Sequence, residues 1–380
     1  MPSQAADQRM DAQLRVAEFF GGIGLVRLAL EPHGFEVVWA NDIEPAKAAL
    51  YVGNFDSADL HLGDIRDVDG GAVPSVDLAT ASFPCTDLSL AGARGGLRGA
   101  ESSMFWQFAR VLDEMGERQP DALLLENVLG FASSREGRDL AAAVAELNRL
   151  GYWCDLFTVD ARWFVPQSRP RMFIVGARKP LDSSGGWEPS PLRPAWVKRF
   201  VEDHPQLQLQ AFPLPDIEPA PVSLAAMVER FPPQDDRWWD PERAGRFVES
   251  LSAIQRARLD ELQRGPRLQW RTAYRRTRDR VAVWEIRADD IAGCLRTARG
   301  GSSRQALVEA GRGQRRVRWM TPREYARLMG ASEYRLGAVR NNQAYFGFGD
   351  AVCVPVIGWI AQHYLRPLLR GDRAGQLTGA

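Results

Sequence analysis

The chain has 380 residues, which is enough for one large or two ordinary domains. Apolar residues make up 45% of it and charged residues 25%, a composition typical of soluble globular proteins that excludes a collagen-like or disordered chain. Because 48 basic and 48 acidic side chains cancel, any attraction to a polyanion must come from a local excess of positive charge.

Neither secretion nor membrane insertion is expected. Residues 1–10 are polar and lack the apolar core of a signal peptide, and no stretch has the apolar length expected of a membrane span. The four cysteines, at positions 85, 154, 294 and 353, show no CxxC spacing, so neither a disulfide framework nor a zinc site is predicted. This cysteine usage fits a reducing cytoplasm.

The first predicted unit is a strand, a glycine turn and a helix. Residues 15–24 form an apolar run that ends in three glycines, and Leu25 to Leu30 begin a helix, as in nucleotide-binding α/β folds. The third glycine of the dinucleotide fingerprint is missing, so NAD is not favoured. Residues 35–40 predict the next strand, and Asp42 at its tip could accept both hydroxyls of a ribose. The alternative is that Asp42 caps the helix that begins near Pro45.

Two further segments suggest a site. Gly63-Asp64-Ile65 is a short polar tip that could meet an adenine or form an ordinary turn. Residues 76–81 predict a buried strand that leads through Pro84, which fixes the local backbone, to Cys85. A thiol held there could act as a nucleophile, although a lone cysteine is more often a small buried apolar residue.

A glycine-rich segment follows, with glycines at 92, 95, 96 and 99. It could close over a substrate or be a plain flexible loop. Residues 103–117 predict a helix, and residues 121–128 predict a strand that is apolar until Glu126-Asn127. Burying a glutamate at the end of such a strand is costly without a partner, which favours a functional role for Glu126.

Residues 165–171 precede another strand, over residues 172–176. Gln167, Arg169 and Arg171 alternate, so in extended geometry their side chains would share one face and could hold a base or a phosphate.

The character of the sequence changes after Arg178, where eleven prolines up to Pro233 predict a domain boundary followed by irregular structure. Residues 255–318 then carry 17 arginines against 7 acidic residues, which indicates either a groove facing phosphates or a solvated arginine-rich surface. Residues 318–330 predict a helix with Thr321 as N-cap and Pro322 at its first position. Residues 343–356 predict a glycine turn that enters a helix.

The order of these motifs resembles that of the bacterial DNA cytosine-5 methyltransferases, from about Arg15 to Tyr364 with the variable middle omitted. Any one motif is weak, but six in the same order argue strongly against a chance match. The matching segments are Phe20 to Gly24, Pro84-Cys85, Glu126 to Val128, Gln167 to Arg171, Arg318 to Gly330 and Phe348 to Val352.

The resemblance implies an α/β fold, a Rossmann-like mixed sheet of the S-adenosylmethionine-dependent methyltransferases, with a smaller, irregular target-recognition domain. It implies a catalytic and cofactor-binding domain at residues 1–180 plus about 341–380, and a DNA-binding domain at about 181–340. The implied partner is double-stranded DNA. A monomer in the bacterial cytoplasm, associated with the nucleoid through DNA, is expected within a restriction-modification or other antiphage system whose nuclease or defence proteins are encoded separately.

The resemblance also implies catalytic roles. Cys85 would add to C6 of a cytosine that has left the stack, and Glu126 would contact N3 and the exocyclic amine. Arg171 would bind the cytosine O2, and Arg169 would steady the loop around the nucleophile. C5 would then take the methyl group of S-adenosylmethionine, leaving S-adenosylhomocysteine, without a metal.

Two groups of binding residues complete the expectation. The residues expected to line the cofactor site are Phe20, Gly22, Ile23, Gly24, Asp42, Ile43, Asp64, Ile65, Pro84, Met104, Ala351 and Val352. Those expected to contact DNA are Ser89, Gln167, Arg296, Arg299, Gly300, Gly301 and Arg304.

Four residues depart from those frequent in the family. Glu18 occupies a position where aspartate is frequent, Thr86 one where glutamine is frequent, Glu101 one where arginine is frequent, and Asp350 one where asparagine is usual. None of these removes the nucleophile or the acid. Thr86 and Glu101 bear on how the space left by the displaced base is filled, and Asp350 adds a charge near the cofactor.

Three other functions remain open from the sequence. The RNA-directed branch of the same family would methylate tRNA, although the middle region with its Gly300-Gly301 loop looks like a DNA recognition domain. A binding protein could keep the fold without catalysis, which the intact Cys85 and Glu126 argue against. A nicotinamide-dependent oxidoreductase is disfavoured by the missing third glycine.

Overall fold

The computed structural model describes residues 13–84, 104–181, 185–278, 280–297 and 304–371. The chain divides into two compact units. The first unit comprises residues 1–160, 170–216 and 356–380, and the second comprises residues 161–169 and 217–355. The expected boundaries near 180 and 340 therefore differ from this division, in which the proline-rich segment up to 216 belongs to the first unit and the segment up to 355 to the second.

A seven-stranded mixed sheet forms the centre of the first unit, in the order β3-β2-β1-β4-β5-β7-β6. Its strands are β1 Leu14–Phe19, β2 Phe35–Asp42, β3 Leu60–Leu62, β4 Leu78–Ala81, β5 Ala122–Val128, β6 Trp153–Asp160 and β7 Pro170–Ala177. Strand β7 pairs antiparallel with β5 and β6, and the other pairs are parallel. The mixed α/β sheet expected from the sequence is confirmed.

The strand order reverses between β1 and β4, because the chain fills one side of β1 with β2 and β3 before it returns to the other side. In open α/β sheets, ligands bind outside the carboxyl ends of the strands at such a switch point. The carboxyl end of β1 leads into the glycine turn, and the carboxyl end of β4 leads towards Pro84. The topology therefore brings two of the predicted motifs to one edge of the sheet.

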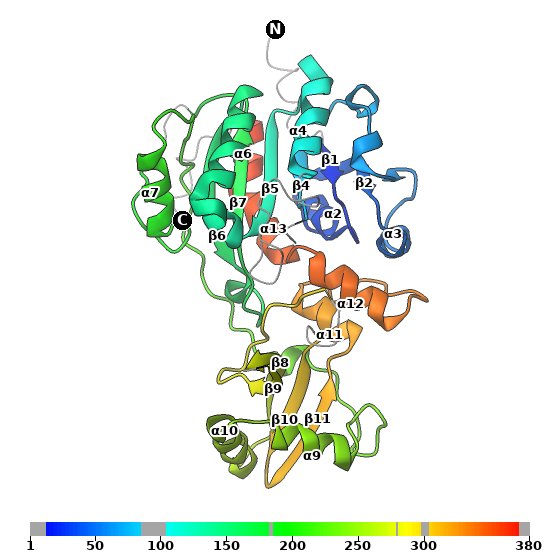
Figure 1. Cartoon of the computed structure of the whole chain (residues 1–380). Helices are drawn as coiled ribbons and strands as arrows, with labels where there is room; N and C mark the ends of the chain where they lie inside the picture. The colour runs from blue at the N-terminus through cyan, green and yellow to red at the C-terminus, as the bar shows by residue number, and fades with distance from the viewer. Residues whose placement is uncertain (1–12, 85–103, 182–184, 279, 298–303, 372–380) are drawn as a thin grey trace, which may run out of the picture. The chain divides into compact units, whose positions relative to one another are not determined.

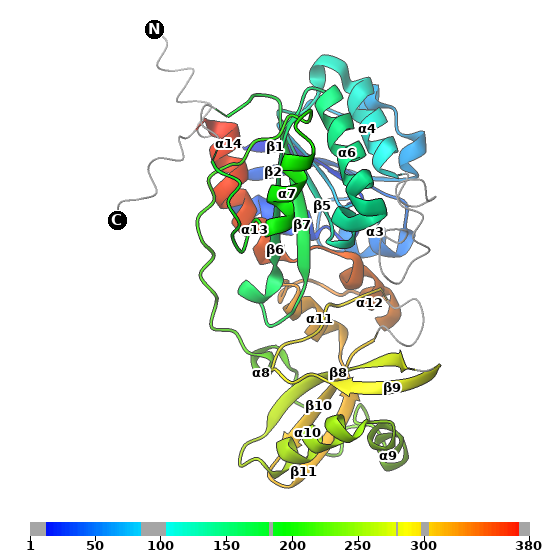
Figure 2. The same cartoon turned by 60° about the vertical axis from the view of Figure 1, so that its left-hand side comes forward.

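Helices cover both faces of this sheet, as Figures 1 and 2 show. Helices α4 and α6 lie on one face, and α13 and α14 lie on the other. The helices of this unit are α2 Leu25–Leu30, α3 Pro45–Val52, α4 Met104–Met115, α5 Gly130–Ser133, α6 Arg138–Arg149, α7 Ala195–Asp203, α13 Val354–Ile360, which begins in the second unit, and α14 Arg366–Arg370.

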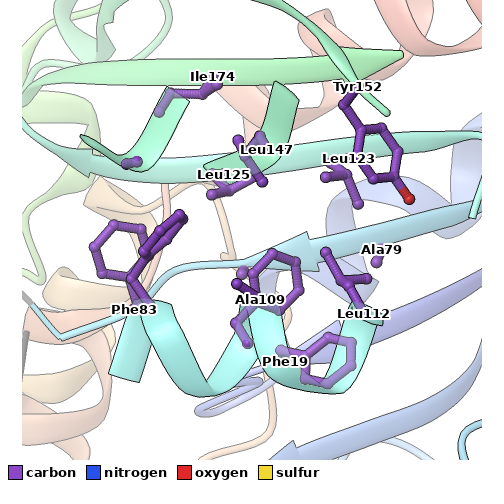
Figure 3. Packing of buried hydrophobic residues seen from close by; sticks show 14 of the residues in the cluster. Phe19, Ala79, Phe83, Ala109, Leu112, Leu123, Leu125, Leu147, Tyr152 and Ile174 are labelled. Atoms are coloured by element: carbon purple, nitrogen blue, oxygen red, sulfur yellow. The ribbon is translucent and has the colours of Figure 1, made fainter. Parts of the chain in front are cut away.

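The apolar core lies between the sheet and helices α4 and α6 (Figure 3). Phe105, Phe108 and Leu112 recur at helical spacing, so α4 presents one buried face. Leu123 and Leu125 of β5 alternate towards the same cluster. This packing makes β4 and β5 a rigid base for the loops that leave their carboxyl ends.

One helical stretch, Asn341–Arg370, is long and apolar enough to cross a membrane by length and composition, contrary to the expectation from the sequence. Two thirds of its most apolar window is buried inside the protein, as in the core helix of a globular domain. Such a stretch is weak evidence for a membrane span.

An antiparallel four-stranded sheet, in the order β11-β10-β8-β9, forms the centre of the second unit, so this region is less irregular than expected. Helices α9 and α10 pack on one of its faces through Phe247, Leu259 and Leu262. The elements are β8 Gln269–Arg278, β9 Val281–Ile286, β10 Ala306–Gly311, β11 Gln314–Trp319, α8 Leu224–Met227, α9 Pro241–Glu249, α10 Ala253–Arg264, α11 Pro322–Leu328 and α12 Asn341–Asp350.

The predicted N-cap of α11 is confirmed. Thr321 accepts a hydrogen bond from the Glu324 backbone, and the Glu324 carboxylate accepts one from the Thr321 backbone, which completes a capping box with Pro322 at the first helical position. The helix is shorter than expected, because Arg318 and Trp319 still belong to β11.

The prediction of a glycine turn within residues 343–356 is wrong, because helix α12 continues through Gly347 and Gly349 to Asp350. A Cβ on Gly349 would lie 2.5 Å from backbone atoms of Arg296 and Thr297. This glycine therefore permits a close approach between two segments rather than a turn.

Candidate active site

The glycine turn after β1 has the left-handed backbone that its sequence favours, with φ of 58° at Gly22 and 77° at Gly24. A Cβ on Gly24 would lie 2.5 Å from the Phe55 ring, so both backbone strain and space exclude a side chain there. Gly24 is also the N-cap residue of α2. The turn is thus fixed by residues that come from outside it.

Asp42 holds this turn in place. Its Oδ2 accepts a hydrogen bond of 2.8 Å from the Gly22 backbone N–H, and its Oδ1 accepts one of 2.8 Å from the Glu44 backbone N–H. The N-cap residue of α3 is Glu44, so the alternative role of Asp42 as that helix's cap does not hold. Its contact with a ribose stays a prediction.

A buried acid lies against the glycine turn. Glu18 is 1% exposed, and the position of a Cβ on Gly21 would lie 3.4 Å from its carboxyl carbon. Neither carboxylate oxygen makes a well-formed hydrogen bond to the described residues. Burial raises the pKa of Glu18 to about 8, although Arg27 acts in the opposite direction. The sequence marked Glu18 only as a departure from the family, since its burial depends on the neighbouring strands.

Three residues of the expected cofactor site follow two neighbouring strands, with Ile43 after β2 and Asp64 and Ile65 after β3. Asp64 caps a short 3-10 helix, accepts 2.9 Å hydrogen bonds from the Arg66 backbone and Nε, and has its pKa lowered by hydrogen bonding to Arg66. Ile65 is buried, and Ile43 is 60% exposed. A pocket of about 310 Å³ beside Asp64 is lined by residues from three segments, including Trp39, Asn41 and His61.

The other expected cofactor residues are divided between the units. Phe20, which has a φ of 56°, Ile23, Pro84 and Met104 lie in the first unit, and Ile23 is buried. Ala351 and Val352 lie in the second unit.

Glu126 and Arg171 form an ion pair at the carboxyl end of β5. Strands β5 and β7 pair antiparallel, with Val128 opposite Arg171, and this register brings Arg171 Nε within 2.8 Å of Glu126 Oε1. Both side chains are largely buried, at 11% and 14% exposure. A paired acid and guanidinium at this position can present a directional set of donors and acceptors to a polar heterocycle.

The neighbouring residue connects this pair to the segment that leads to Cys85. Asn127 Nδ2 donates a 3.3 Å hydrogen bond to the backbone carbonyl of Phe83, two residues before the cysteine. Ala81, the last residue of β4, pairs with Leu125 in the parallel β4–β5 register, so β4 ends one residue short of the level of Glu126. Sequence reasoning missed the bond made by Asn127, because it depends on which strands are neighbours.

Several expected site residues lie outside the described ranges. They are Cys85, Thr86, Ser89, Glu101, Arg299, Gly300 and Gly301.

Gln167 and Arg169 belong to the second unit and Arg171 to the first, so a face shared by the three side chains stays a prediction. Gln167 has no exposed surface with which to contact DNA, and its amide bonds the Leu328 carbonyl and the Leu295 N–H at 2.8 and 3.1 Å. The alternation of residues 167, 169 and 171 did not reveal the burial of Gln167, because that burial depends on residues far along the chain.

Arg169 is a buried connector within the second unit. It donates hydrogen bonds to the backbone carbonyls of Leu295, at 2.9 Å, and Ala351, at 2.5 Å. It thereby ties the segment before Arg296 to the segment after α12, and two motifs far apart in the sequence meet around one guanidinium. This contact fits a role in steadying neighbouring structure.

Arg304, expected to contact DNA, is partly buried against aromatic rings. Its guanidinium lies 4.2 Å from the centre of the Tyr345 ring and 5.2 Å from that of Trp319, and it donates a 2.7 Å hydrogen bond to the Tyr345 hydroxyl. The backbone of Arg296, another residue expected to contact DNA, packs closely against Gly349 of α12. Among the described residues, no group of three or more His, Cys, Asp or Glu side chains is placed to hold a metal ion.

Comparison with known proteins agrees with this arrangement. The chain matches the family model described as C-5 cytosine-specific DNA methylase over residues 14–366. It is 27% identical over 361 residues to the Type II methyltransferase M.Bsp6I of Bacillus sp. (strain RFL6), which covers 94% of this chain and 100% of that protein. It is 29% identical to the Type II methyltransferase M.DsaV of Dactylococcopsis salina, over 93% of this chain and 86% of that one.

Solved structures show the same fold. The S. pombe Dnmt2 methyltransferase superposes with a TM-score of 0.59 at 19% identity, over 94% of this chain and 99% of that one. A putative DNA modification methyltransferase encoded within an E. coli prophage superposes with a TM-score of 0.54 at 19% identity. Since the family model spans nearly the whole sequence, the chain belongs to the C-5 cytosine-specific DNA methylase family.

Proposed function

We propose that this protein transfers a methyl group from S-adenosylmethionine to C5 of a cytosine flipped out of a short specific DNA sequence, through a covalent bond between Cys85 and C6. The observation that carries the proposal is the Glu126–Arg171 pair beside the segment that leads to Cys85. Two similar proteins are named Type II methyltransferases. We therefore also propose that this protein acts in a restriction-modification or other antiphage system with a separately encoded nuclease.

The residues around the glycine turn fit the cofactor. Glu18 is a buried acid without a well-formed hydrogen bond to the described residues, and a cationic ligand above the turn would favour its ionised form; S-adenosylmethionine carries a sulfonium and an amino group. Asp42 keeps the Gly22 backbone in position. Among the described residues beyond its chain neighbours, only the Phe20 carbonyl oxygen, at 3.9 Å, lies within 4 Å of the Cβ position of Gly22, so a ligand has room to approach there. When bound, S-adenosylmethionine supplies an electrophilic methyl group.

The chain's own residues would carry the steps at the base. The Cys85 thiolate adds to C6, which makes C5 nucleophilic and moves negative charge towards N3. Glu126 binds N3 and the exocyclic amine, so a carboxyl group meets the charge as it develops. Arg171, held by Glu126, binds the cytosine O2. After methylation, loss of the C5 proton and elimination of Cys85 release 5-methylcytosine.

The test is base-resolution methylation sequencing of plasmid DNA from a host without cytosine methylation, expressing either the native protein or Cys85→Ser. We expect one short motif with 5-methylcytosine in the native sample alone. A duplex with 5-fluorocytosine in that motif should trap the native protein covalently. Methylation by Cys85→Ser would contradict the role of the thiol, and methylation of tRNA but not DNA by the native protein would contradict the substrate.

A further inference from the structure

The outer half of the β8–β9 hairpin stands apart from the rest of its sheet. Strand β8 pairs with β10 only from Gln269 to Ala273, whereas it pairs with β9 from Ala273 to Arg278. Residues 274–278 and 281–285 therefore form a two-stranded ribbon, and within the part of the chain that the structure describes no third strand pairs with it. Figure 2 shows this hairpin reaching past the other strands of the small sheet.

One face of the ribbon presents exposed arginines. Arg276 and Arg278 alternate on the same face, and their side chains are 56% and 64% exposed. Val281, which pairs with Arg278, is 61% exposed on that face. The face therefore offers two exposed guanidinium groups and one exposed apolar side chain to a binding partner.

A single acid positions both arginines. The Glu285 carboxylate lies 3.0 Å from Arg276 Nε and 2.8 Å from Arg278 Nη2, and the Arg276 guanidinium also lies 5.2 Å from the Tyr274 ring centre. Two cations share one anion, so the face keeps net positive charge. Exposed ion pairs contribute little to stability, so these guanidinium groups can exchange Glu285 for a stronger anionic or bidentate partner.

The dimensions and chemistry of the ribbon fit double-stranded DNA. The major groove admits a two-stranded β-ribbon, arginine recognises guanine through O6 and N7, and an apolar side chain can contact the thymine methyl group. The opposite face is unsuited to this task, because Arg275 there lies 5.9 Å from the buried Trp284 ring centre.

We propose that this ribbon enters the major groove of the DNA substrate and reads its sequence through Arg276 and Arg278. The inference rests on the proposed function and deepens it. Within the arginine-rich stretch 255–318, it assigns recognition to two arginines that were not among the individual residues expected to contact DNA.

The test compares Arg276→Ala/Arg278→Ala with a control of equal charge, Arg246→Ala/Arg315→Ala, whose exposed arginines lie in the same unit outside the ribbon. Affinity for a duplex carrying the methylated motif is measured at several salt concentrations. We expect binding by the ribbon variant to weaken about tenfold or more, with methylation at other sequences rising relative to the motif. The control variant and the affinity of all variants for S-adenosylmethionine should stay unchanged.

Two further measurements give opposite or selective effects that misfolding cannot mimic. Glu285→Gln removes the competing anion, so it should tighten DNA binding several-fold. A duplex with 7-deazaguanine in the motif lacks the N7 acceptor, and this change should weaken the native protein more than the ribbon variant.

Equal binding and equal sequence preference in the ribbon and control variants would overturn the ribbon assignment while the methyltransferase function stands. Equal losses on 7-deazaguanine DNA would overturn its entry into the major groove. Absence of both DNA binding and DNA methylation in the native protein would overturn the inference together with the proposed function.

Discussion

At the residue scale, the site depends on a few positions where burial and backbone geometry leave little choice. Glu18 is an acid held in an apolar environment beside the glycine turn, and Gly24 occupies a left-handed position against the Phe55 ring. Both residues lie in one short segment of the sequence, but the burial of Glu18 and the contact of Gly24 with Phe55 come from residues elsewhere in the fold. Both can be tested without knowledge of the DNA motif.

Glu18 should make the stability of the cofactor-free protein depend on pH. Burial raises its pKa from 4.5 to about 8 in the folded state, so the folded state binds the proton more tightly than the unfolded state. This contribution is fully present below pH 4.5 and is lost as pH rises through about 8. Relative to Glu18→Gln, the native protein should lose about 1.4 kcal/mol for each pH unit in that window.

Denaturant unfolding at pH 5, 7 and 9 measures this difference. Glu36→Gln, an exposed acid on the neighbouring strand β2, is the control and should follow the native curve. Parallel curves for the native protein and Glu18→Gln would show that Glu18 is ionised in the folded state.

Gly24→Ala should disrupt the turn. A Cβ there would lie 2.5 Å from Phe55 and would require a φ of 77° that L residues rarely adopt, so we expect a loss of about 2 kcal/mol in unfolding free energy. Binding of S-adenosylmethionine, measured by calorimetry, should also be lost. Gly63→Ala is the matched control, because a Cβ at Gly63 meets nothing within 4 Å. Similar stability for the two variants would contradict the steric argument.

At the scale of elements, α11 is held at its start by a local cap and by a buried ion pair. Arg318 and Glu324 are both fully buried, and their bidentate contacts are 2.5 and 2.9 Å long. The Arg318 guanidinium also lies 4.7 Å from the Phe231 ring centre. Strand β11, helix α11 and the segment around residue 231 are thereby joined at one point.

Removing one partner of this pair should cost more than removing both. Glu324→Gln leaves the Arg318 charge buried and should lower the unfolding free energy of this unit by about 3–5 kcal/mol. Arg318→Met combined with Glu324→Leu should restore most of that loss, because no uncompensated charge remains. Thr321→Ala, which removes one side of the cap and the hydrogen bond that the Thr321 hydroxyl donates to the Glu229 carboxylate, should cost about 1–2 kcal/mol. Urea unfolding of these three variants and the native protein gives the comparison, and a double variant no more stable than Glu324→Gln would contradict it.

At the scale of the whole molecule, the first unit is assembled from three separate stretches of chain. A buried cluster joins them, since Asp155 of β6 accepts hydrogen bonds from Arg193, at 2.6 Å, and from the Tyr364 hydroxyl, at 3.0 Å. Asp155 also accepts a bond from the Phe212 backbone N–H. Burial raises the pKa of Asp155, but the neighbouring guanidinium and these donors oppose that effect. The cluster ties the C-terminal helical stretch to the far edge of the sheet.

Tyr364→Phe should loosen this assembly selectively. The change removes one buried hydrogen bond without a change of shape and should cost about 1–2 kcal/mol. Hydrogen exchange should accelerate in β6 and in residues 356–371 and stay unchanged in residues 217–355. Equal acceleration in both units would show that the effect is not carried by this cluster.

The sequence by itself determined the features whose signals lie within a few residues. The glycine turn after β1, the strand that carries Glu126 near its end and the cap at Thr321 all follow from local patterns, because a turn or a cap is built from near neighbours. The order of these motifs was enough to identify the family.

Only the tertiary structure decided which distant residues meet. Gln167 and Arg169 make their hydrogen bonds within the second unit, while Arg171 pairs with Glu126. Gly349 lies in helix α12, where it lets the backbone of residues 296 and 297 come close, and it does not form a turn. The ribbon of β8 and β9 likewise depends on where β10 stops pairing with β8. These outcomes follow from strand order and register, which local periodicity does not contain, because residues far apart along the chain determine them.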